Sequence, residues 1–362
     1  MRIVMATITG IRNLAKARWR KFKTLLAWRY MLGNYWGERL RDYPLIVALK
    51  LLFSRFVFLT QIPLLLPDRA FLVNYHGAKL GIRLFSHPAL MDLALGVYEY
   101  RKTRLFYQLV KEGMTVIDIG ASEGSYSVLS AKLLHDKGRV LAFEPDPDNC
   151  RLLKENIRLN RFKSIGVHQF ALSDAEGIAT FYPGGGLGSI VARSPWYANF
   201  QREPITVPVR KLDDVLAKLA IFHVDIMKID VEGSEILVLR GAEQILRNSS
   251  VHLLMDIDVE SDAERIELYK LLDSFGYEMY RIGKRLIPIR NPDELLIYFN
   301  DPMAITGNSG SFRNGTMSSF KDRLRKIIPR RLLRPLGAIY YFMRPQFKKR
   351  QVVRDIYAIK VR

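Results

Sequence analysis

Two acidic residues, each at the end of an apolar run of strand type, have the clearest chemical potential in this sequence. Asp118 closes one such run and precedes the turn Gly120-Ala-Ser-Glu-Gly124, which opens a helix. Glu144 closes the next run, Val140–Phe143, 24 residues beyond Gly120. One acid at the tip of each of two successive strand–helix units can hold a nucleotide-like cofactor by its ribose and by the charged group beside the ribose.

The spacing of the glycines distinguishes between cofactors. A dinucleotide-binding turn reads G-x-G-x-x-G and places a pyrophosphate at a helix N-terminus. Here the first glycine follows an acid by two residues, and the G-x-G pattern is missing. S-adenosylmethionine has no phosphate and carries a positive sulfonium and a positive α-amino group, so an acidic neighbourhood complements it. We therefore predict S-adenosylmethionine as the cofactor; the alternative is an ordinary strand–turn–helix with incidental acids.

The turn residues can be given individual roles toward that cofactor. Gly120 would let the backbone approach the aminoacyl part, and Gly124 would let the helix pack closely. Ser122 could add a hydrogen bond, and Glu144 is placed to accept from both ribose hydroxyls. Asp174 follows the third strand and is predicted to bind the adenine amino group, with a plain turn residue as the alternative.

A second acidic cluster ends the fourth strand. Lys228 and Asp230 share one face of the strand, and Glu232 follows where a helix is about to start. Methylation of an alcohol needs a base near the attacking hydroxyl, or a metal that acidifies it, and carboxylates could serve either way. We predict Asp230, Glu232 and Lys228 as catalytic residues and assign no metal site. Helix caps and a salt bridge are the structural alternative, and we expect Glu235 to cap the first helical turn.

Five motifs in this order resemble the FkbM family of S-adenosylmethionine-dependent methyltransferases: Gly96-x-Tyr-Glu99, Val116-Ile-Asp-Ile-Gly-Ala121, Ala142-Phe-Glu-Pro145, Leu172-Ser-Asp174 and Lys228-Ile-Asp-Val-Glu-Gly233. The resemblance covers roughly residues 95–300. It implies O-methylation of a hydroxyl on a sugar, glycan or polyketide.

The resemblance also implies site residues. Asp118, Gly120 and Glu144 would hold the cofactor, Asp230 and Glu232 would line the reacting centre, and Glu99 would approach the cofactor from the lead-in segment. The sequence departs from the family at Ser122, where asparagine is usual, and at Asp256, where glutamate is frequent. The second departure puts a shared role for Asp256 in doubt.

Strand-like and helix-like segments alternate along the middle of the chain. We predict an α/β fold with a Rossmann-like, doubly wound, seven-stranded methyltransferase sheet and basic helical extensions at both ends. The predicted strands are 115–119, 139–144, 165–171, 224–229, 251–257, 278–282 and 294–300. The predicted helices are 124–135, 147–160, 211–219, 234–247 and 262–275. Strand-like runs at 177–182 and 205–210 interrupt this order, and the glycine-rich segment 184–189 lies between them.

The charge of +20 is concentrated at the two ends of the chain. Residues 1–110 hold 18 Lys and Arg against 5 Asp and Glu, and residues 301–362 hold 15 against 3, whereas residues 111–300 have a net charge of −5. We therefore divide the chain into a basic, amphipathic helical region (1–94), a methyltransferase domain (95–300), a flexible linker (301–319) and a basic tail (320–362). An amphipathic helix is expected at 12–30.

Basic residues interleaved with aromatics favour an anionic membrane surface or a polyanion, although a solvated basic face is the plain alternative. The uncharged run 56–67 is shorter than the roughly 20 residues that span a bilayer, so we expect an interfacial or core-docked segment. We predict a cytoplasmic protein, peripheral at the membrane. Cys150 is the single cysteine and excludes an intrachain disulfide.

These observations favour an O-methyltransferase that acts on a saccharide, a glycan or a lipid-linked acceptor. A nucleic-acid methyltransferase is an alternative suggested by the basic flanks. Against it, base-amine methylases usually end strand four in an Asn/Asp-Pro-Pro-aromatic turn, and paired carboxylates repel phosphates. A membrane-docked scaffold without activity is a third reading. The sequence defines neither the acceptor nor the oligomeric state.

Overall fold

The computed structural model describes residues 44–59, 70–83, 90–184, 188–191, 203–258, 261–296 and 355–360. The helix predicted at 12–30, the linker at 301–319 and most of the predicted tail lie outside these residues. The chain divides into one unit of Met1–Leu295 with Val353–Arg362 and a second unit of Leu296–Val352. Apart from Leu296, every described residue belongs to the first unit.

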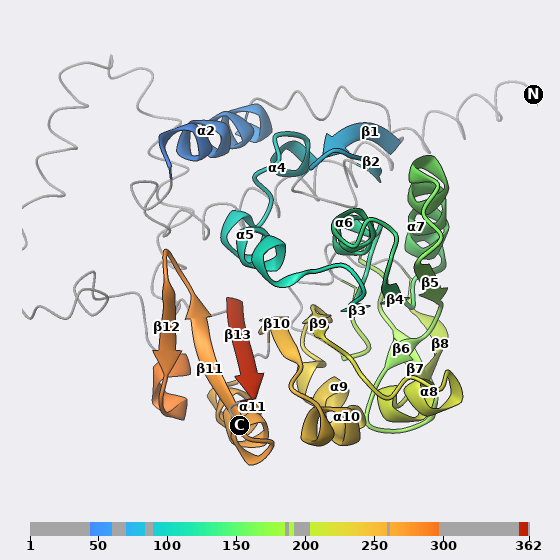
Figure 1. Cartoon of the computed structure of the whole chain (residues 1–362), viewed down its shortest axis with the longest axis vertical. Coiled ribbons are helices and arrows are strands. Elements are labelled where there is room, and N and C mark those ends of the chain that lie inside the picture. The colour runs from blue at the N-terminus through green and yellow to red at the C-terminus, as the bar shows by residue number, and fades with distance from the viewer. Residues whose placement is uncertain are drawn as a thin grey trace, which may run out of the picture. The chain divides into compact units, whose positions relative to one another are not determined.

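An eight-stranded sheet forms the centre of this unit, with the order β12-β11-β13-β10-β9-β3-β4-β5 (Figure 1). Strands β9, β3, β4, β5 and β10 pair in parallel, and β13 is antiparallel to both of its neighbours. The predicted Rossmann-like α/β sheet is confirmed, with one more strand than expected. The strands are β3 (Thr115–Ile119), β4 (Arg139–Phe143), β5 (Ile165–His168), β9 (Ile226–Ile229), β10 (His252–Asp256), β11 (Tyr277–Ile282), β12 (Leu286–Ile289) and β13 (Asp355–Lys360).

Both faces of the central strands are buried, which explains their nearly continuous apolar sequences. Side chains alternate between two hydrophobic clusters: Val116 and Ile226 belong to one, and Ile117 and Met227 belong to the other. This alternation fixes the register, since a slip of one residue would move every side chain to the opposite face.

Helices cover the two faces. Those that follow the N-terminal lead-in and β3 pack on the face of Val116, while those between β8 and β11 pack on the face of Ile117 (Figure 1). The helices are α4 (Leu90–Ala94), α5 (Tyr100–Leu109), α6 (Ser125–Leu133), α7 (Pro147–Asn160), α8 (Leu212–Lys218), α9 (Glu235–Gly241), α10 (Glu243–Asn248) and α11 (Asp262–Ser274). The helix predicted at 234–247 is thus two helices, separated at Ala242.

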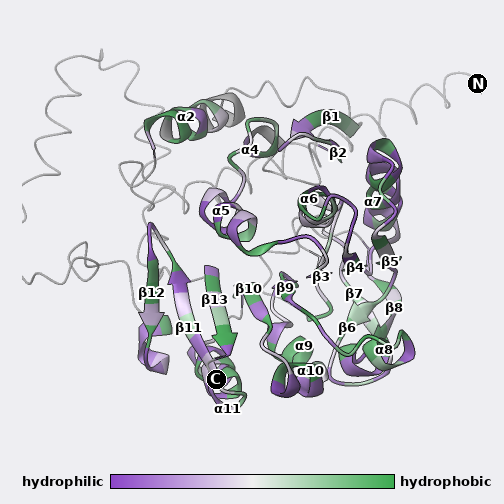
Figure 2. Ribbon diagram, in the orientation of Figure 1, coloured by the Kyte–Doolittle hydropathy of each residue, from purple (hydrophilic) through white to green (hydrophobic). Residues whose placement is uncertain are grey.

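The position of β13 corrects the sequence analysis. We placed the seventh strand at 294–300 and treated 355–360 as part of a basic tail. Instead, residues 294–296 lie in a 3-10 helix, η3 (Pro292–Leu296), and residues 297–300 lie outside the described residues. Residues 355–360 insert between β10 and β11. Most of β13 is coloured hydrophobic in Figure 2, whereas α7 is largely hydrophilic. The apolar side chains Ile356, Tyr357 and Ala358 are buried in the sheet, and their burial stabilises the strand there.

Two smaller sheets flank the large one. Strands β1 (Ala70–Tyr75) and β2 (Ala78–Arg83) form an antiparallel hairpin. Strands β6 (Ala171–Leu172), β7 (Gly177–Phe181) and β8 (Ile205–Arg210) form a three-stranded sheet in the order β6-β8-β7. The strand predicted at 165–171 is therefore divided between β5 and β6, which belong to different sheets.

Helix α2 (Leu45–Leu59) precedes both smaller sheets in the chain. Its side chains Leu45, Ile46, Leu49 and Phe53 are exposed, by 52% to 76%. Within the part of the chain that the structure describes, no helix combines the length and the apolar character needed to cross a bilayer.

Candidate active site

The turn after β3 brings the backbone of two strands into direct contact. Gly120 has a φ of +73°, and an ideal Cβ there would lie 1.8 Å from the carbonyl oxygen of Asp230. Gly124 has a φ of +92°, and a Cβ there would lie 2.2 Å from Leu153 Cδ1 of α7. Both positions therefore require glycine. At Gly124 the close neighbour is Leu153 of α7, and the predicted packing of the helix against the aminoacyl part of the cofactor stays a prediction.

Glu144 ends β4 as predicted and is almost fully buried. One carboxylate oxygen accepts the backbone N–H of Ser122 and the other accepts that of Asp146, both at 2.8 Å. Burial raises the pKa of Glu144 to about 7, against the lowering effect of these two backbone donors. Ser122 thus reaches Glu144 through its backbone, while its hydroxyl donates to Glu123 at 2.7 Å.

Asp118 is also buried, and it faces Lys228 on the neighbouring strand β9. Asp118 of β3 and Lys228 of β9 are register partners, and their charged groups lie 3.6 Å apart. One Asp118 oxygen accepts the hydroxyl of Ser127 at 2.6 Å, and the other makes no hydrogen bond within the described residues. This second oxygen is the one that faces the Lys228 ammonium, so the Asp118 carboxylate is the partner of a cation that the protein itself supplies.

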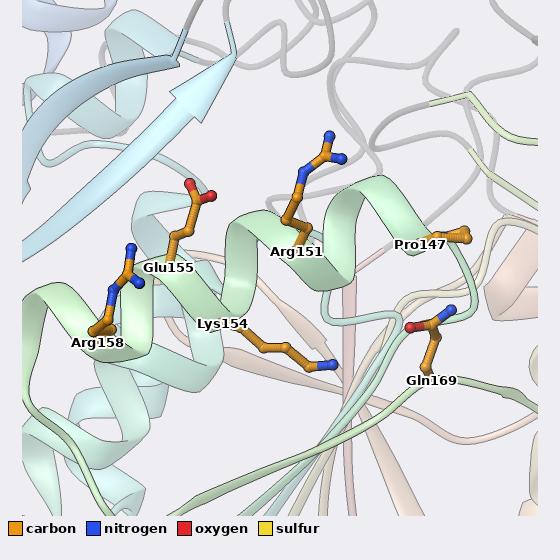
Figure 3. Close-up of a pocket in the computed structure, with 6 residues that line it drawn as sticks. All are labelled: Pro147, Arg151, Lys154, Glu155, Arg158 and Gln169. Atoms are coloured by element: carbon orange, nitrogen blue, oxygen red, sulfur yellow. The ribbon is translucent and has the colours of Figure 1, made fainter.

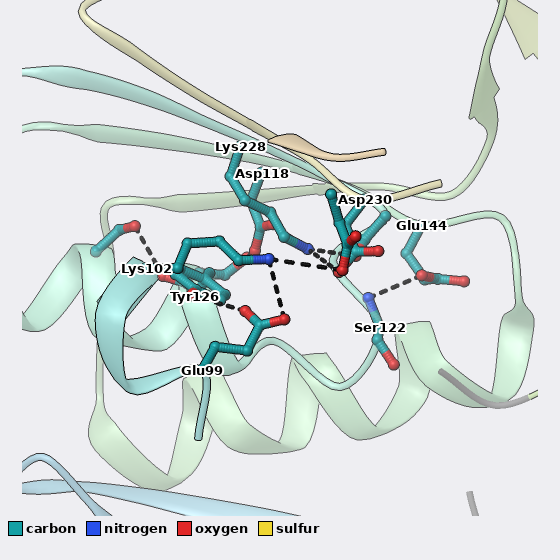
Figure 4. Close-up of polar contacts among 12 residues, drawn as sticks. Glu99, Lys102, Asp118, Ser122, Tyr126, Glu144, Lys228 and Asp230 are labelled. Atoms are coloured by element: carbon teal, nitrogen blue, oxygen red, sulfur yellow. Dashed lines mark hydrogen bonds and ion pairs between the residues drawn. The ribbon is translucent and has the colours of Figure 1, made fainter. Parts of the chain in front are cut away.

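Lys228 lies between two predicted site residues, as Figure 4 shows. Its Nζ lies 3.2 Å from an Asp230 oxygen and donates to the Gly120 carbonyl at 3.2 Å. Burial disfavours the ammonium, but the Asp230 and Asp118 carboxylates outweigh burial and raise the pKa of Lys228. Burial likewise opposes the ionised form of Asp230, yet Lys228 keeps the pKa of Asp230 below its usual value. The pair is therefore ionic near neutral pH.

Glu232 occupies the turn between β9 and α9 with a φ of +53°. Its carbonyl oxygen accepts a hydrogen bond from the hydroxyl of Ser189 at 2.9 Å. This bond connects the end of the glycine-rich segment to the turn after β9. Glu235 is fully buried and accepts the Gly233 N–H at 2.9 Å, so it holds this turn. Burial raises the pKa of Glu235 to about 7.

Glu99 reaches the same region from the N-terminal side of α5, with a φ of +42°. One oxygen accepts Lys102 Nζ at 3.0 Å, and the other accepts the hydroxyl of Tyr126 at 2.8 Å (Figure 4). The Tyr126 ring in turn lies under Lys228 Nζ, 5.4 Å from the ring centre. These contacts connect Glu99 to Lys228 on β9 through Tyr126.

Sequence reasoning missed Lys102. This side chain is 1% exposed, and its ammonium lies 2.9 Å from Asp355, 3.0 Å from Glu99 and 3.7 Å from Asp256. Glu99, Asp256 and Asp355 each place an oxygen within 4.8 Å of the others, which is the spacing of a metal site, but Lys102 supplies a cation to all three. The sequence contains one weak indication of this contact: Lys102 is three residues after Glu99, a spacing at which two side chains can pair on a helix.

A pocket joins several of the predicted residues. Its lining includes Gly120, Ser122, Glu144, Asp230 and Glu232 together with the apolar Ile119, Phe143, Phe170, Leu172, Phe181 and Ile190. Asp174 is absent from this lining; its side chain is 37% exposed and lies 4.0 Å from Arg240. Its contact with adenine stays a prediction.

These residues fit an adenosine carrying a cationic chain. The pocket offers apolar walls for a base and the Glu144 carboxylate for ribose hydroxyls, while Asp118 is absent from the pocket lining and pairs with Lys228. The ion pairs near the pocket form two separate groups, one around Lys102 and one around Lys228. Together they comprise five carboxylates and two lysines, a formal charge of −3. That excess of negative charge complements a sulfonium and an ammonium.

A second hollow lies along α7 and shares no residue with this pocket (Figure 3). It is lined by Pro147, Arg151, Lys154, Glu155, Arg158 and Gln169. Its side chains are predominantly basic, so it lacks the negative charge that a sulfonium requires.

The fold is Rossmann-like, and the lining of the pocket fits a nucleoside cofactor with a cationic chain. Residues 118–279 match the model of the methyltransferase FkbM domain. The matched residues, less than half of the chain, are therefore similar to a methyltransferase domain of the FkbM type, as the motifs predicted, and the methyl donor of that family is S-adenosylmethionine.

Three curated relatives extend the comparison. 2-O-methyltransferase NoeI of Sinorhizobium fredii is 27% identical over 54% of this chain and 86% of its own length. Hexuronic acid methyltransferase AglP of Haloferax volcanii is 25% identical over 47% and 65%, respectively. The 31-O-demethyl-FK506 methyltransferase FkbM of Streptomyces tacrolimicus is 32% identical over 37% and 61%. The chain thus spans less than two thirds of the latter two.

Among solved structures, a methyltransferase FkbM from Methylobacillus flagellatus KT aligns with 54% of this chain and 49% of its own. The sequence identity is 20% and the TM-score is 0.35.

Proposed function

We propose that the protein transfers a methyl group from S-adenosylmethionine to a hydroxyl of a sugar, a glycan or a glycolipid. The observation that carries the proposal is the position of Asp230, which lines the pocket beside Gly120 and Glu144 and forms an ion pair with the buried Lys228. A carboxylate held in its ionised form at the pocket can accept the proton of an attacking hydroxyl. NoeI and AglP, by their names a 2-O-methyltransferase and a hexuronic acid methyltransferase, support a saccharide acceptor.

The residues divide the work between binding and chemistry. Glu144 would hold the ribose, and Asp118 and Glu99 would hold the aminoacyl end. When bound, the donor would supply a methyl group on a sulfonium sulfur; the O–CH3 bond would form as the S–CH3 bond breaks, and the sulfur would leave as a neutral thioether. Asp230 would orient the acceptor hydroxyl and take its proton, while Lys228 would keep Asp230 ionised. Glu232 would position the acceptor through the turn that Ser189 anchors.

Calorimetry and labelled methyl transfer test this proposal. The wild-type protein should bind S-adenosylmethionine, and Glu144→Ala should abolish that binding while Asp230→Ala should preserve it. Labelled methyl should then pass to the glycan or lipid fraction of a cell extract. Transfer to RNA instead would favour the nucleic-acid alternative, and donor binding without transfer to any fraction would favour an inactive scaffold.

A membrane surface is the partner that α2 favours. The exposed Leu45, Ile46, Leu49 and Phe53 recur at helical spacing on this helix. The chain carries no acid before Glu38, so anionic lipids would meet little repulsion. We therefore propose that α2 lies in the interface of an anionic bilayer, with its apolar side chains inserted.

Vesicle sedimentation tests the membrane contact. Phe53→Asp should weaken binding to vesicles that contain phosphatidylserine. Phe222→Asp is the matched control, because Phe222 is also exposed, by 79%, but lies outside α2. Equal binding by both variants and the wild type would exclude insertion of α2.

A further inference from the structure

Two carboxylates lie side by side across the junction of β10 and β13. Asp256 and Asp355 are register partners in this antiparallel pair. Like charges directly opposite each other destabilise a sheet unless a cation lies between them. Lys102 of α5 is that cation, and Glu99 is its third carboxylate partner.

Asp355 is a close carboxylate partner of the buried Lys102. Burial opposes the ammonium form, and Asp355 is the strongest of the carboxylates that nevertheless raise the pKa of Lys102 well above its usual value. The distance from Lys102 Nζ to Asp355 is 2.9 Å, compared with 3.0 Å to Glu99. The ammonium is therefore shared, and Glu99 holds only part of it.

This sharing has a consequence for ligand binding. If Asp355 lost its charge, Lys102 would have one competitor fewer and would pair more fully with Glu99. The Lys102 ammonium would then neutralise the Glu99 carboxylate. The site would also retain one negative charge fewer for an incoming ammonium group.

Resting on the proposed function, we infer that Asp355 is a positioning residue for the donor: it shares the Lys102 ammonium with Glu99, so that Glu99 keeps part of its negative charge for the α-amino group. The assignment makes β13, distant from the glycine turn in sequence, a part of the donor site. It also explains why an aspartate begins a strand whose next three side chains are buried and apolar.

Ligands that share the adenosine and differ in the groups on sulfur provide the test. S-adenosylmethionine carries the sulfonium and the α-amino group, whereas 5′-methylthioadenosine is a neutral thioether without the aminoacyl chain. S-adenosylhomocysteine keeps the α-amino group on a neutral sulfur, so its Kd should change in the same way as that of S-adenosylmethionine. Calorimetry with the full chain should show that Asp355→Asn raises the Kd for S-adenosylmethionine by about tenfold, as expected for one charged contact. The Kd for methylthioadenosine should change by less than about twofold.

Three variants sharpen the result. Asp355→Glu keeps the charge and should restore the affinity for S-adenosylmethionine. Asp273→Asn removes an exposed carboxylate from α11 and should change none of these Kd values. If Asp355→Asn does not fold, Asp355→Ser supplies the same comparison, since it too removes the carboxylate and remains small and polar.

The outcomes separate this inference from the proposed function. A variant that loses affinity for S-adenosylmethionine and methylthioadenosine equally would show a general structural role and overturn the inference, as would an unchanged Kd for S-adenosylmethionine. In both cases donor binding by the wild type would leave the proposed function standing. A wild-type protein that binds none of these ligands would overturn both.

Discussion

The carbonyl oxygen of Asp230 occupies the space that a side chain on Gly120 would need, 1.8 Å from the ideal Cβ position. The end of strand β9 therefore packs directly against the glycine turn that follows β3. A group bound at the turn and a group bound by Asp230 must lie next to each other, which is what transfer between two ligands requires.

This contact predicts unequal effects of two glycine substitutions. Gly113 and Gly120 both have positive φ values, +84° and +73°, but a Cβ on Gly113 would have no neighbour within 4 Å. Gly113→Ala should cost on the order of 1 kcal/mol through backbone strain alone. Gly120→Ala should cost more than about 3 kcal/mol, because backbone atoms must also move. Urea denaturation of both variants measures the difference, and equal losses would contradict the close approach.

The ion pair of Lys228 and Asp230 predicts a separation of binding from turnover. Asp230→Asn should reduce methyl transfer by about 100-fold or more, as for loss of a general base. The Kd for the donor should change by less than about threefold, because other residues hold the ribose. Asp214→Asn removes an exposed carboxylate and is the control. Full turnover in Asp230→Asn, measured with labelled donor, would remove Asp230 from the chemistry.

Glu144 predicts a pH dependence of nucleoside binding. Its pKa is raised to about 7, so it is largely protonated at about pH 6 and largely ionised at about pH 8. Ribose hydroxyls donate to the ionised form, and affinity should increase roughly tenfold over this range. Methylthioadenosine is the suitable ligand, because its adenosine does not titrate there. Glu144→Gln should bind methylthioadenosine weakly at every pH. If the affinity of this variant still increased with pH as in the wild type, another group would be responsible for the titration.

Glu235 predicts a pH dependence of folding. Burial raises its pKa from 4.5 to about 7 in the folded state. Between these values the unfolded chain releases a proton that the folded protein retains, so stability falls as pH rises and levels off above about 7. The loss attributable to Glu235 is on the order of 3 kcal/mol.

Glu235→Gln tests this expectation because it removes the titration and keeps the shape. The free energy of unfolding of wild type minus that of the variant should fall between pH 4.5 and 7. A difference that is constant with pH would show that Glu235 titrates normally in the folded protein.

The sequence predicted the parallel half of the sheet well. Strands such as Thr115–Ile119 and Arg139–Phe143 are buried on both faces, so their short apolar runs stand out from the polar turns around them. The acids at their tips are also recognisable, because the carboxyl ends of parallel strands all meet at one edge.

The antiparallel end of the sheet was not predictable in the same way. Strand β13 is separated from β11 by more than seventy residues, and nothing local in Asp355–Lys360 indicates which strands it joins. Lys102 was missed for a related reason. It lies within the basic run Arg101–Arg104, which has the composition of a solvated helix face, and two of its three carboxylate partners come from the distant strands β10 and β13.

The insertion of β13 between β10 and β11 has a consequence for fragments of this protein. Any version cut before residue 353 would leave two neighbouring strands with unsatisfied backbone donors and acceptors along facing edges. Such open edges recruit strands from other molecules, so truncation there should produce aggregates rather than a smaller soluble enzyme.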